Sequence, residues 1–177
     1  MSTEESTRAT VSTQRVLTDA MIAEIRAFFP RYPSRQAVTL PALHVVHQRL
    51  RHVPRQAVVE IAQLLGLAPS QVQDTLTFYG FFKQDAPHGR LRIWVCRSLS
   101  CHLRGADELL DYLCQRTGIA AGEATPDGGL TVEFAECLGA CELAPCALAG
   151  DTLEACLTKD KLDELLASWQ RNEAAGG

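Results

Sequence analysis

Apolar residues recur at the spacing of an amphipathic helix through the first half of the chain. The first such stripe consists of Met21, Ile22, Ile25, Phe28 and Phe29. Thr18 precedes the stripe as a residue type that caps helix N-termini, and Pro30 and Pro33 follow it, where a helix does not easily continue. This pattern predicts a helix that begins after Thr18 and ends before Pro30.

Three more helices are predicted up to residue 80, and each begins at or near a proline. Proline suits the first turn of a helix because its φ angle is already helical and no N–H is left unpaired there. Pro41, Pro54 and Pro69 are placed in this way, and Gly66 follows the third helix where a C-terminal cap is expected. The pattern therefore predicts a bundle of short helices.

The pattern changes after a polar loop, QDAPHGR, at residues 84–90. Short apolar segments at 91–95 and 130–134 predict strands, and the amphipathic segment 103–116 between them predicts a crossover helix. A hairpin that turns at Gly150 and Asp151 comes next, and a helix is predicted over 158–169 with Thr158 as its N-cap. A strand, a helix and a strand followed by a hairpin and a helix is the order of a thioredoxin-like domain.

These changes divide the chain into four segments. Residues 1–15 are expected to be a disordered tail, 16–83 a helical segment, 84–170 the thioredoxin-like domain and 171–177 a flexible tail. Residues 1–15 lack the apolar core of a secretory signal, and no stretch reaches the roughly 20 apolar residues of a membrane helix. We therefore expect a cytoplasmic protein without direct membrane insertion.

Composition adds one restriction. The chain of 177 residues has a net charge of −4, and the negative charge lies in its second half, where residues 91–177 hold seven Lys and Arg against fourteen Asp and Glu. The first half is slightly basic but has no dense Lys/Arg run with interleaved aromatic residues. The sequence therefore predicts no nucleic-acid partner.

Cysteine carries the candidate chemistry. Two pairs follow the two predicted strands, Cys96 with Cys101 as C-x4-C and Cys137 with Cys141 as C-x3-C. If those strands are parallel neighbours, both pairs leave the same end of the sheet, which is the end where ligands bind in open α/β sheets. Four thiols can then converge on one point.

Several kinds of site use paired cysteines, and spacing alone leaves two of them open. A disulfide framework is disfavoured because the chain is large enough for a core, and a redox dithiol would require C-x-x-C. Four thiolates suit a tetrahedral zinc ion, although the usual knuckle has C-x2-C, and they also suit a 2Fe–2S cluster. Gly139, Ser98 and Ser100 lie where they can donate to sulfur, which favours the cluster.

The remaining candidates have simpler interpretations. Cys114, Cys146 and Cys156 are interpreted as small buried hydrophobic residues rather than ligands. Cys146 lies five residues after Cys141, so it is also close enough to replace a lost ligand. His44 and His47 stand one helical turn apart, and they are interpreted as part of a solvated helix face.

Longer motifs resemble a known family. VCRSLSCHLRGADELLDYL and ECLGACELAP, with LPALHVVHQRLRHVPRQAVVEIAQLLGLAPSQVQDTLTFYGFF upstream, are similar to the thioredoxin-like 2Fe–2S subunit of respiratory NADH:quinone oxidoreductase, complex I. The same subunit occurs in NAD-linked formate dehydrogenases and NAD-reducing hydrogenases. The resemblance covers roughly residues 20–170. The chain departs from the family at Cys146, where an apolar residue is usual.

The resemblance implies a fold, a cofactor and a partner. It implies an α+β chain, with an N-terminal short-helix bundle followed by a thioredoxin-like α/β ferredoxin domain, and one 2Fe–2S cluster held by Cys96, Cys101, Cys137 and Cys141. It also implies electron exchange with the flavin of a partner subunit that binds FMN and NADH, in a complex at the inner face of the membrane. No catalytic residue is expected, because the chain has no G-x-G-x-x-G fingerprint and the cofactor carries the chemistry. A zinc-stabilised protein-binding adaptor remains the alternative from another class.

Overall fold

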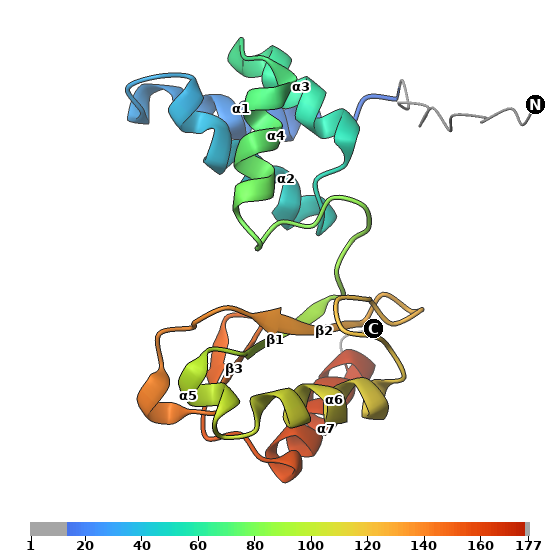
Figure 1. The fold of residues 1–177 in the computed structure, drawn as a ribbon. Coiled ribbons are helices and arrows are strands. Elements are labelled where there is room, and N and C mark those ends of the chain that lie inside the picture. Colours follow the sequence, from blue (N-terminus) through green and yellow to red (C-terminus); the bar gives the residue numbers. More distant parts are fainter. Residues whose placement is uncertain (1–13, 176–177) are drawn as a thin grey trace, which may run out of the picture. The chain divides into compact units, whose positions relative to one another are not determined.

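The structure is a computed structural model that describes residues 14–175. The tail predicted at 1–15 therefore lies outside the described residues, apart from Gln14 and Arg15. The chain divides into two compact units, of which the first ends at Pro87 and the second begins at His88. Figure 1 shows helices alone in the first unit, and a sheet with helices in the second.

The described part of the first unit contains four α-helices and two short 3₁₀ helices. The α-helices are α1 (Asp19–Ala27), α2 (Thr39–Leu50), α3 (Arg55–Leu65) and α4 (Pro69–Phe78). The 3₁₀ helices are η1 (Phe29–Arg31) and η2 (Gln36–Val38). Each of the four predicted helices is therefore present.

Local signals explain where these helices begin and end. The Thr18 hydroxyl accepts the Met21 N–H at 3.2 Å and caps α1, as predicted. Gly66 ends α3 in the left-handed conformation, with φ of 70°, which glycine adopts without steric cost. The predicted start at Pro41 is wrong by two residues, since α2 begins at Thr39. Pro41 still lies in the first turn, where its missing N–H costs little.

The core of the first unit confirms the predicted stripes and corrects one interpretation. Val58, Ile61 and Leu65 on α3 are all buried. His47, however, is only 2% exposed and its ring packs on Phe81 and Phe82. It is not part of a solvated face, because the residues after α4 fold back over this side of α2.

The second unit is a four-stranded sheet with helices. Its strands are β1 (Leu91–Cys96), β2 (Leu130–Ala135), β3 (Ala147–Ala149) and β4 (Thr152–Glu154). Its helices are α5 (Leu99–His102), α6 (Ala106–Thr117), the 3₁₀ helix η3 (Cys141–Leu143) and α7 (Lys159–Ala175). This arrangement confirms the α+β, thioredoxin-like fold class.

The strand order is β2-β1-β3-β4, with β1 and β2 parallel and the remaining pairs antiparallel. Helices α6 and α7 lie on the same side of this sheet in Figure 1. Alternate strand residues, such as Ile93, Val132 and Ala147, join Leu110 and Leu162 of these helices in one buried core. The crossover helix and the hairpin turn at Gly150 and Asp151 are where the sequence predicts them.

Two predicted boundaries in this unit are corrected. The helix expected over 103–116 begins only at Ala106, because residues 103–105 form a turn after the separate short helix α5, and Gly105 in that turn has a φ of 83°. The tail expected at 171–177 is helical up to Ala175. Its residues Arg171, Glu173 and Ala174 favour helix, and Glu173 forms an ion pair with Arg90.

Candidate metal centre

The two cysteine pairs begin at the same end of the sheet. Cys96 is the last residue of β1, and its register partner on the parallel strand β2 is Ala135, two residues before Cys137. The Arg97 N–H donates to the Ala135 carbonyl at 3.0 Å, which ties the two strand ends together. The prediction that both pairs emerge at one sheet end is confirmed.

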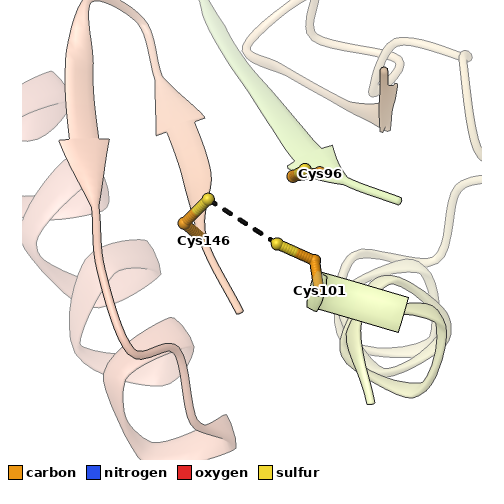
Figure 2. A group of neighbouring side chains, drawn as sticks. All are labelled: Cys96, Cys101 and Cys146. Carbon is orange, nitrogen blue, oxygen red and sulfur yellow. Dashed lines mark hydrogen bonds between the residues drawn. The ribbon is translucent and has the colours of Figure 1, made fainter. Parts of the chain in front are cut away.

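Three sulfurs meet at this end. The Sγ atoms of Cys96, Cys101 and Cys146 all lie within 4.8 Å of one another, and all three residues are buried. Figure 2 shows them approaching from three elements: the end of β1, helix α5 and the residue before β3. The Sγ atoms of Cys101 and Cys146 are 3.8 Å apart. A hydrogen bond of 3.0 Å from the Cys96 N–H to the Cys146 carbonyl holds the residue before β3 beside the end of β1.

The second predicted pair lies on an exposed loop. Cys137 and Cys141 are both exposed, and within residues 14–175 they do not belong to the buried trio. Gly139 between them has a φ of 76°, and its N–H donates to the Cys137 sulfur at 3.4 Å. The loop lies close to the trio, because the Leu138 backbone N–H is near enough to the Cys96 sulfur to lower the pKa of that thiol. The structure thus brings the sulfurs of Cys96 and Cys101 within 4.8 Å of each other, whereas Cys137 and Cys141 lie on the exposed loop.

The three buried thiols differ in acidity. Burial raises the pKa of Cys96, but N–H groups of Leu138 and Ser98 and the neighbouring thiols outweigh burial, so the pKa is lowered overall. Burial raises the pKa of Cys101, and raises that of Cys146 to about 12. Cys96 is therefore the member of the trio that ionises most readily.

Charged residues around the site largely neutralise one another. The Arg97 guanidinium binds the Glu136 carboxylate at 2.5 Å, so the residues that follow Cys96 and precede Cys137 form an exposed ion pair. His102 contacts Asp107 through Nδ1 at 2.8 Å. Arg104 donates to the Ala144 carbonyl at 3.1 Å and holds α5 near the segment that carries Cys146.

Sequence reasoning misses a contact of Cys146 and misplaces Cys156. Cys146 is buried, as predicted, but its contact with Cys101 is not among the predictions. The signal that could have shown it is its place directly before β3, since an antiparallel neighbour of β1 brings its first residues to the end of β1. Cys156 is exposed rather than a core residue. Its positive φ of 48° lies in the tight connection between β4 and α7. Cys114 is partly buried against the core.

The comparison with protein families decides the class. The model of the thioredoxin-like [2Fe–2S] ferredoxins matches residues 25–170. The chain belongs to this ferredoxin family. The resemblance stated from the sequence motifs is thereby confirmed.

Relatives of this ferredoxin are subunits of larger enzymes. It is 40% identical over 153 residues to an NADH-quinone oxidoreductase subunit of Rhizobium meliloti (strain 1021), a match that covers 86% of this chain and 90% of that protein. It is 40% identical over 142 residues to NADH-quinone oxidoreductase subunit 2 of Thermus thermophilus, a match that covers 78% of this chain and 78% of that protein. It is 26% identical over 154 residues to NADP-reducing hydrogenase subunit HndA of Solidesulfovibrio fructosivorans, which covers 87% of this chain and 90% of that protein.

A solved structure with the same fold is that of an NAD⁺-reducing [NiFe]-hydrogenase in the air-oxidized state. The TM-score is 0.62 at 28% identity, and the match covers 73% of this chain. The ferredoxin spans only 23% of that hydrogenase chain. The match therefore supports the fold, and hydrogenase activity is not transferred from it.

The residues at the sheet end fit a [2Fe–2S] cluster. Such a cluster is held by cysteine thiolates and stabilised by hydrogen bonds to sulfur. The site offers buried thiols, N–H donors from Leu138 and Ser98, and an open Gly139, where an added Cβ would meet no atom within 4 Å.

Among residues 14–175, no helix combines the length and apolar character needed to cross a bilayer.

Proposed function

We propose that this ferredoxin is the electron-transfer subunit of an NADH:quinone oxidoreductase and holds one [2Fe–2S] cluster through Cys96, Cys101, Cys137 and Cys141. The observation that supports the proposal is that the two cysteine pairs follow the ends of two adjacent parallel strands. The 40% identity to two NADH-quinone oxidoreductase subunits supports the choice of complex. We also infer a cytoplasmic location, with contact to the membrane only through the complex.

The protein's own residues bind and position the cofactor. Cys96 and Cys101 are buried and would supply two thiolates, and the exposed Cys137 and Cys141 on the loop with Gly139 would complete the set. The bound cluster supplies one-electron redox chemistry. Backbone N–H groups of Leu138 and Ser98 stabilise negative charge on the Cys96 sulfur. No general acid, base or nucleophile is required for electron transfer.

The partner we propose is a subunit that binds flavin and NADH. This chain has no dinucleotide fingerprint, so it needs another protein to collect electrons from NADH. Leu99 and Leu103 stand one helical turn apart beside Cys101 and are 72% and 75% exposed. Exposed leucines next to a redox site are suited to contact with a protein partner, because binding removes their apolar surface from water.

The first unit is proposed as a docking element for the same partner. Electron transfer requires the cluster to lie close to its donor, and a ferredoxin domain alone does not need the helices of residues 16–83. Phe78, at the end of α4, is 80% exposed, and Tyr79 beside it is 40% exposed. Aromatic side chains of this kind are enriched where proteins bind one another.

Anaerobic purification with metal analysis tests the cluster and its ligands. The proposal predicts about two irons and two labile sulfides per chain and a potential of about −400 mV, as expected for all-cysteine ligation. Cys96→Ser and Cys137→Ser are expected to lose the visible spectrum, whereas Cys114→Ser, the control, retains it. Stoichiometric zinc without iron in the native protein would instead support the zinc-stabilised adaptor.

A second assembly is favoured by one observation, the likeness to hydrogenase subunits. The same electron-transfer role in an NAD-linked hydrogenase or formate dehydrogenase differs only in the partners. Affinity purification of the native complex distinguishes these assemblies. Co-purification of a nickel-iron or molybdenum subunit instead of quinone-reducing subunits would reassign the chain.

A further inference from the structure

The trio of buried thiols has a geometry of its own. Two sulfurs that each lie about 2.3 Å from one tetrahedral ion stand about 3.8 Å apart. The Sγ atoms of Cys101 and Cys146 are separated by 3.8 Å, and Cys96 completes a group whose sulfurs all lie within 4.8 Å of one another. A single thiophilic ion can therefore reach all three sulfurs with small side-chain movements.

We propose that the cluster-free protein binds one zinc ion through Cys96, Cys101 and Cys146. The three thiols give up their protons to become ligands. Three protein ligands leave the fourth tetrahedral position to water or an external thiol. This site differs from the cluster site in what it binds, a zinc ion instead of a cluster, and in its ligands. Cys146 takes part in it, and the exposed Cys137 and Cys141 do not.

The backbone holds the trio in place without a metal. Cys96 ends β1, and its N–H is bonded to the Cys146 carbonyl at 3.0 Å. Cys101 lies on α5, which Arg104 ties to the Ala144 carbonyl two residues before Cys146. Because the three Cα positions are set by a sheet end and an anchored helix, little conformational entropy is lost when the ion binds.

A consequence follows for cluster assembly, and it rests on the proposed function. Cys96 and Cys101 belong to both ligand sets, so zinc and the cluster exclude each other. Zinc bound to the trio blocks cluster assembly, and Cys146 is what makes this chain sensitive to zinc.

Cobalt(II) titration of the full-length, cluster-free protein under anaerobic, reducing conditions tests the site. Cobalt replaces zinc in tetrahedral thiolate sites and gives visible d–d bands, together with a near-ultraviolet sulfur-to-metal charge-transfer band whose intensity scales with the number of thiolates. Wild type is expected to bind one ion, with zinc displacing it. Cys146→Ala and Cys146→Ser are expected to weaken zinc binding by more than about 100-fold, since even residues that only support a ligand cost 10–100-fold. Cys114→Ala is the matched control and is expected to bind zinc like wild type.

Two variants separate this inference from the proposed function. Cys146→Ala is expected to assemble the cluster and to do so even with zinc present at a level that blocks wild type. Cys137→Ala is expected to lose the cluster but keep the zinc site. Circular dichroism confirms that each variant is folded before it is scored.

Two results would overturn the inference: wild type without tetrahedral cobalt bands, or Cys146 variants with wild-type zinc affinity. Loss of zinc binding in Cys137→Ala with retention in Cys146→Ala would move the site to the exposed loop and would also overturn it. Failure of wild type to assemble any cluster would count against the proposed function alone.

Discussion

Arg92 and Glu133 form a buried ion pair on β1 and β2. Their side chains are only 8% and 11% exposed. The Trp94 indole N–H donates to the same carboxylate at 2.5 Å, and the Arg92 guanidinium lies 4.2 Å from the centre of the Trp94 ring. Burial lowers the pKa of Arg92, and Glu133 opposes that shift. The Glu133 carboxylate on β2 thus binds both Arg92 and Trp94 of β1, and its loss would remove this hydrogen-bond partner from both side chains.

We predict that Glu133→Gln destabilises the second unit by about 3 kcal/mol, because it removes the carboxylate beside a buried guanidinium. Both tryptophans, Trp94 and Trp169, lie in the second unit, so urea unfolding followed by tryptophan fluorescence reports on that unit alone. Glu136→Gln, which breaks the exposed pair with Arg97, is the control and is expected to cost less than about 1 kcal/mol. Equal costs for the two variants would contradict this.

At the residue scale, the sequence indicates part of the site. It predicts Cys96 and Cys101 as a pair at a strand end, because a period-two pattern followed by cysteine is a local signal. It does not predict the contact of Cys146 with Cys101, or the burial of His47. Both depend on which segments fold back on one another, and that information is not local.

Helices α6 and α7 are joined by a shared carboxylate. The Tyr112 hydroxyl donates to Asp163 at 2.7 Å, and the Arg116 guanidinium donates to it at 2.9 Å. The Tyr112 hydrogen bond, followed by Arg116, lowers the pKa of Asp163 below its ordinary value of 3.8. Because the pKa is lower in the folded state, this contribution to stability is complete above the ordinary pKa and disappears as the pH falls through the folded one.

We predict that Asp163→Asn lowers the melting temperature at pH 7, and that its difference from wild type shrinks below about pH 4. Thermal unfolding followed by tryptophan fluorescence from about pH 7 to about pH 2.5 measures this difference. Glu164→Gln, at the next and exposed position of α7, is expected to leave the melting temperature unchanged throughout. A difference between Asp163→Asn and wild type that is constant with pH would refute the assigned role.

At the element scale, helix and strand types are predictable from the sequence, and their ends are less so. The types follow from apolar periodicity, which extends over many residues. The ends depend on single residues whose effect varies with context. Pro41 predicts the start of α2, but Thr39 starts it, since proline fits any position of the first turn. The periodicity places Gly105 inside a helix, but it divides α5 from α6.

The whole chain consists of two units with separate cores, one formed by the helices before Pro87 and one around the sheet. Every cysteine of the proposed site, and both tryptophans, belong to the second unit. The two units can therefore be tested separately for cofactor binding and for partner binding.

We predict that a shortened chain of residues 88–177 assembles the cluster but no longer co-purifies with the flavin-binding subunit. Spectra and iron content measure assembly, and pull-down measures binding. Removal of residues 1–13 alone is the control and is expected to change neither. Undiminished binding by the shortened chain would refute the docking role of the helices, and failure to fold would show that the helices stabilise the sheet instead.

The parallel pairing of β1 with β2 also bears on the order of events during biosynthesis. Cys96 and Cys146 are about fifty residues apart in the chain and meet only after the crossover through α6 has closed and β3 has joined the sheet. Metal or cluster therefore binds the folded second unit in preference to the unfolded chain, and its binding free energy adds to the stability of that unit alone. The helical unit contains no cysteine and leaves the ribosome first. It can complete its core before the first thiol of the site has been synthesised, so its folding does not depend on the iron supply.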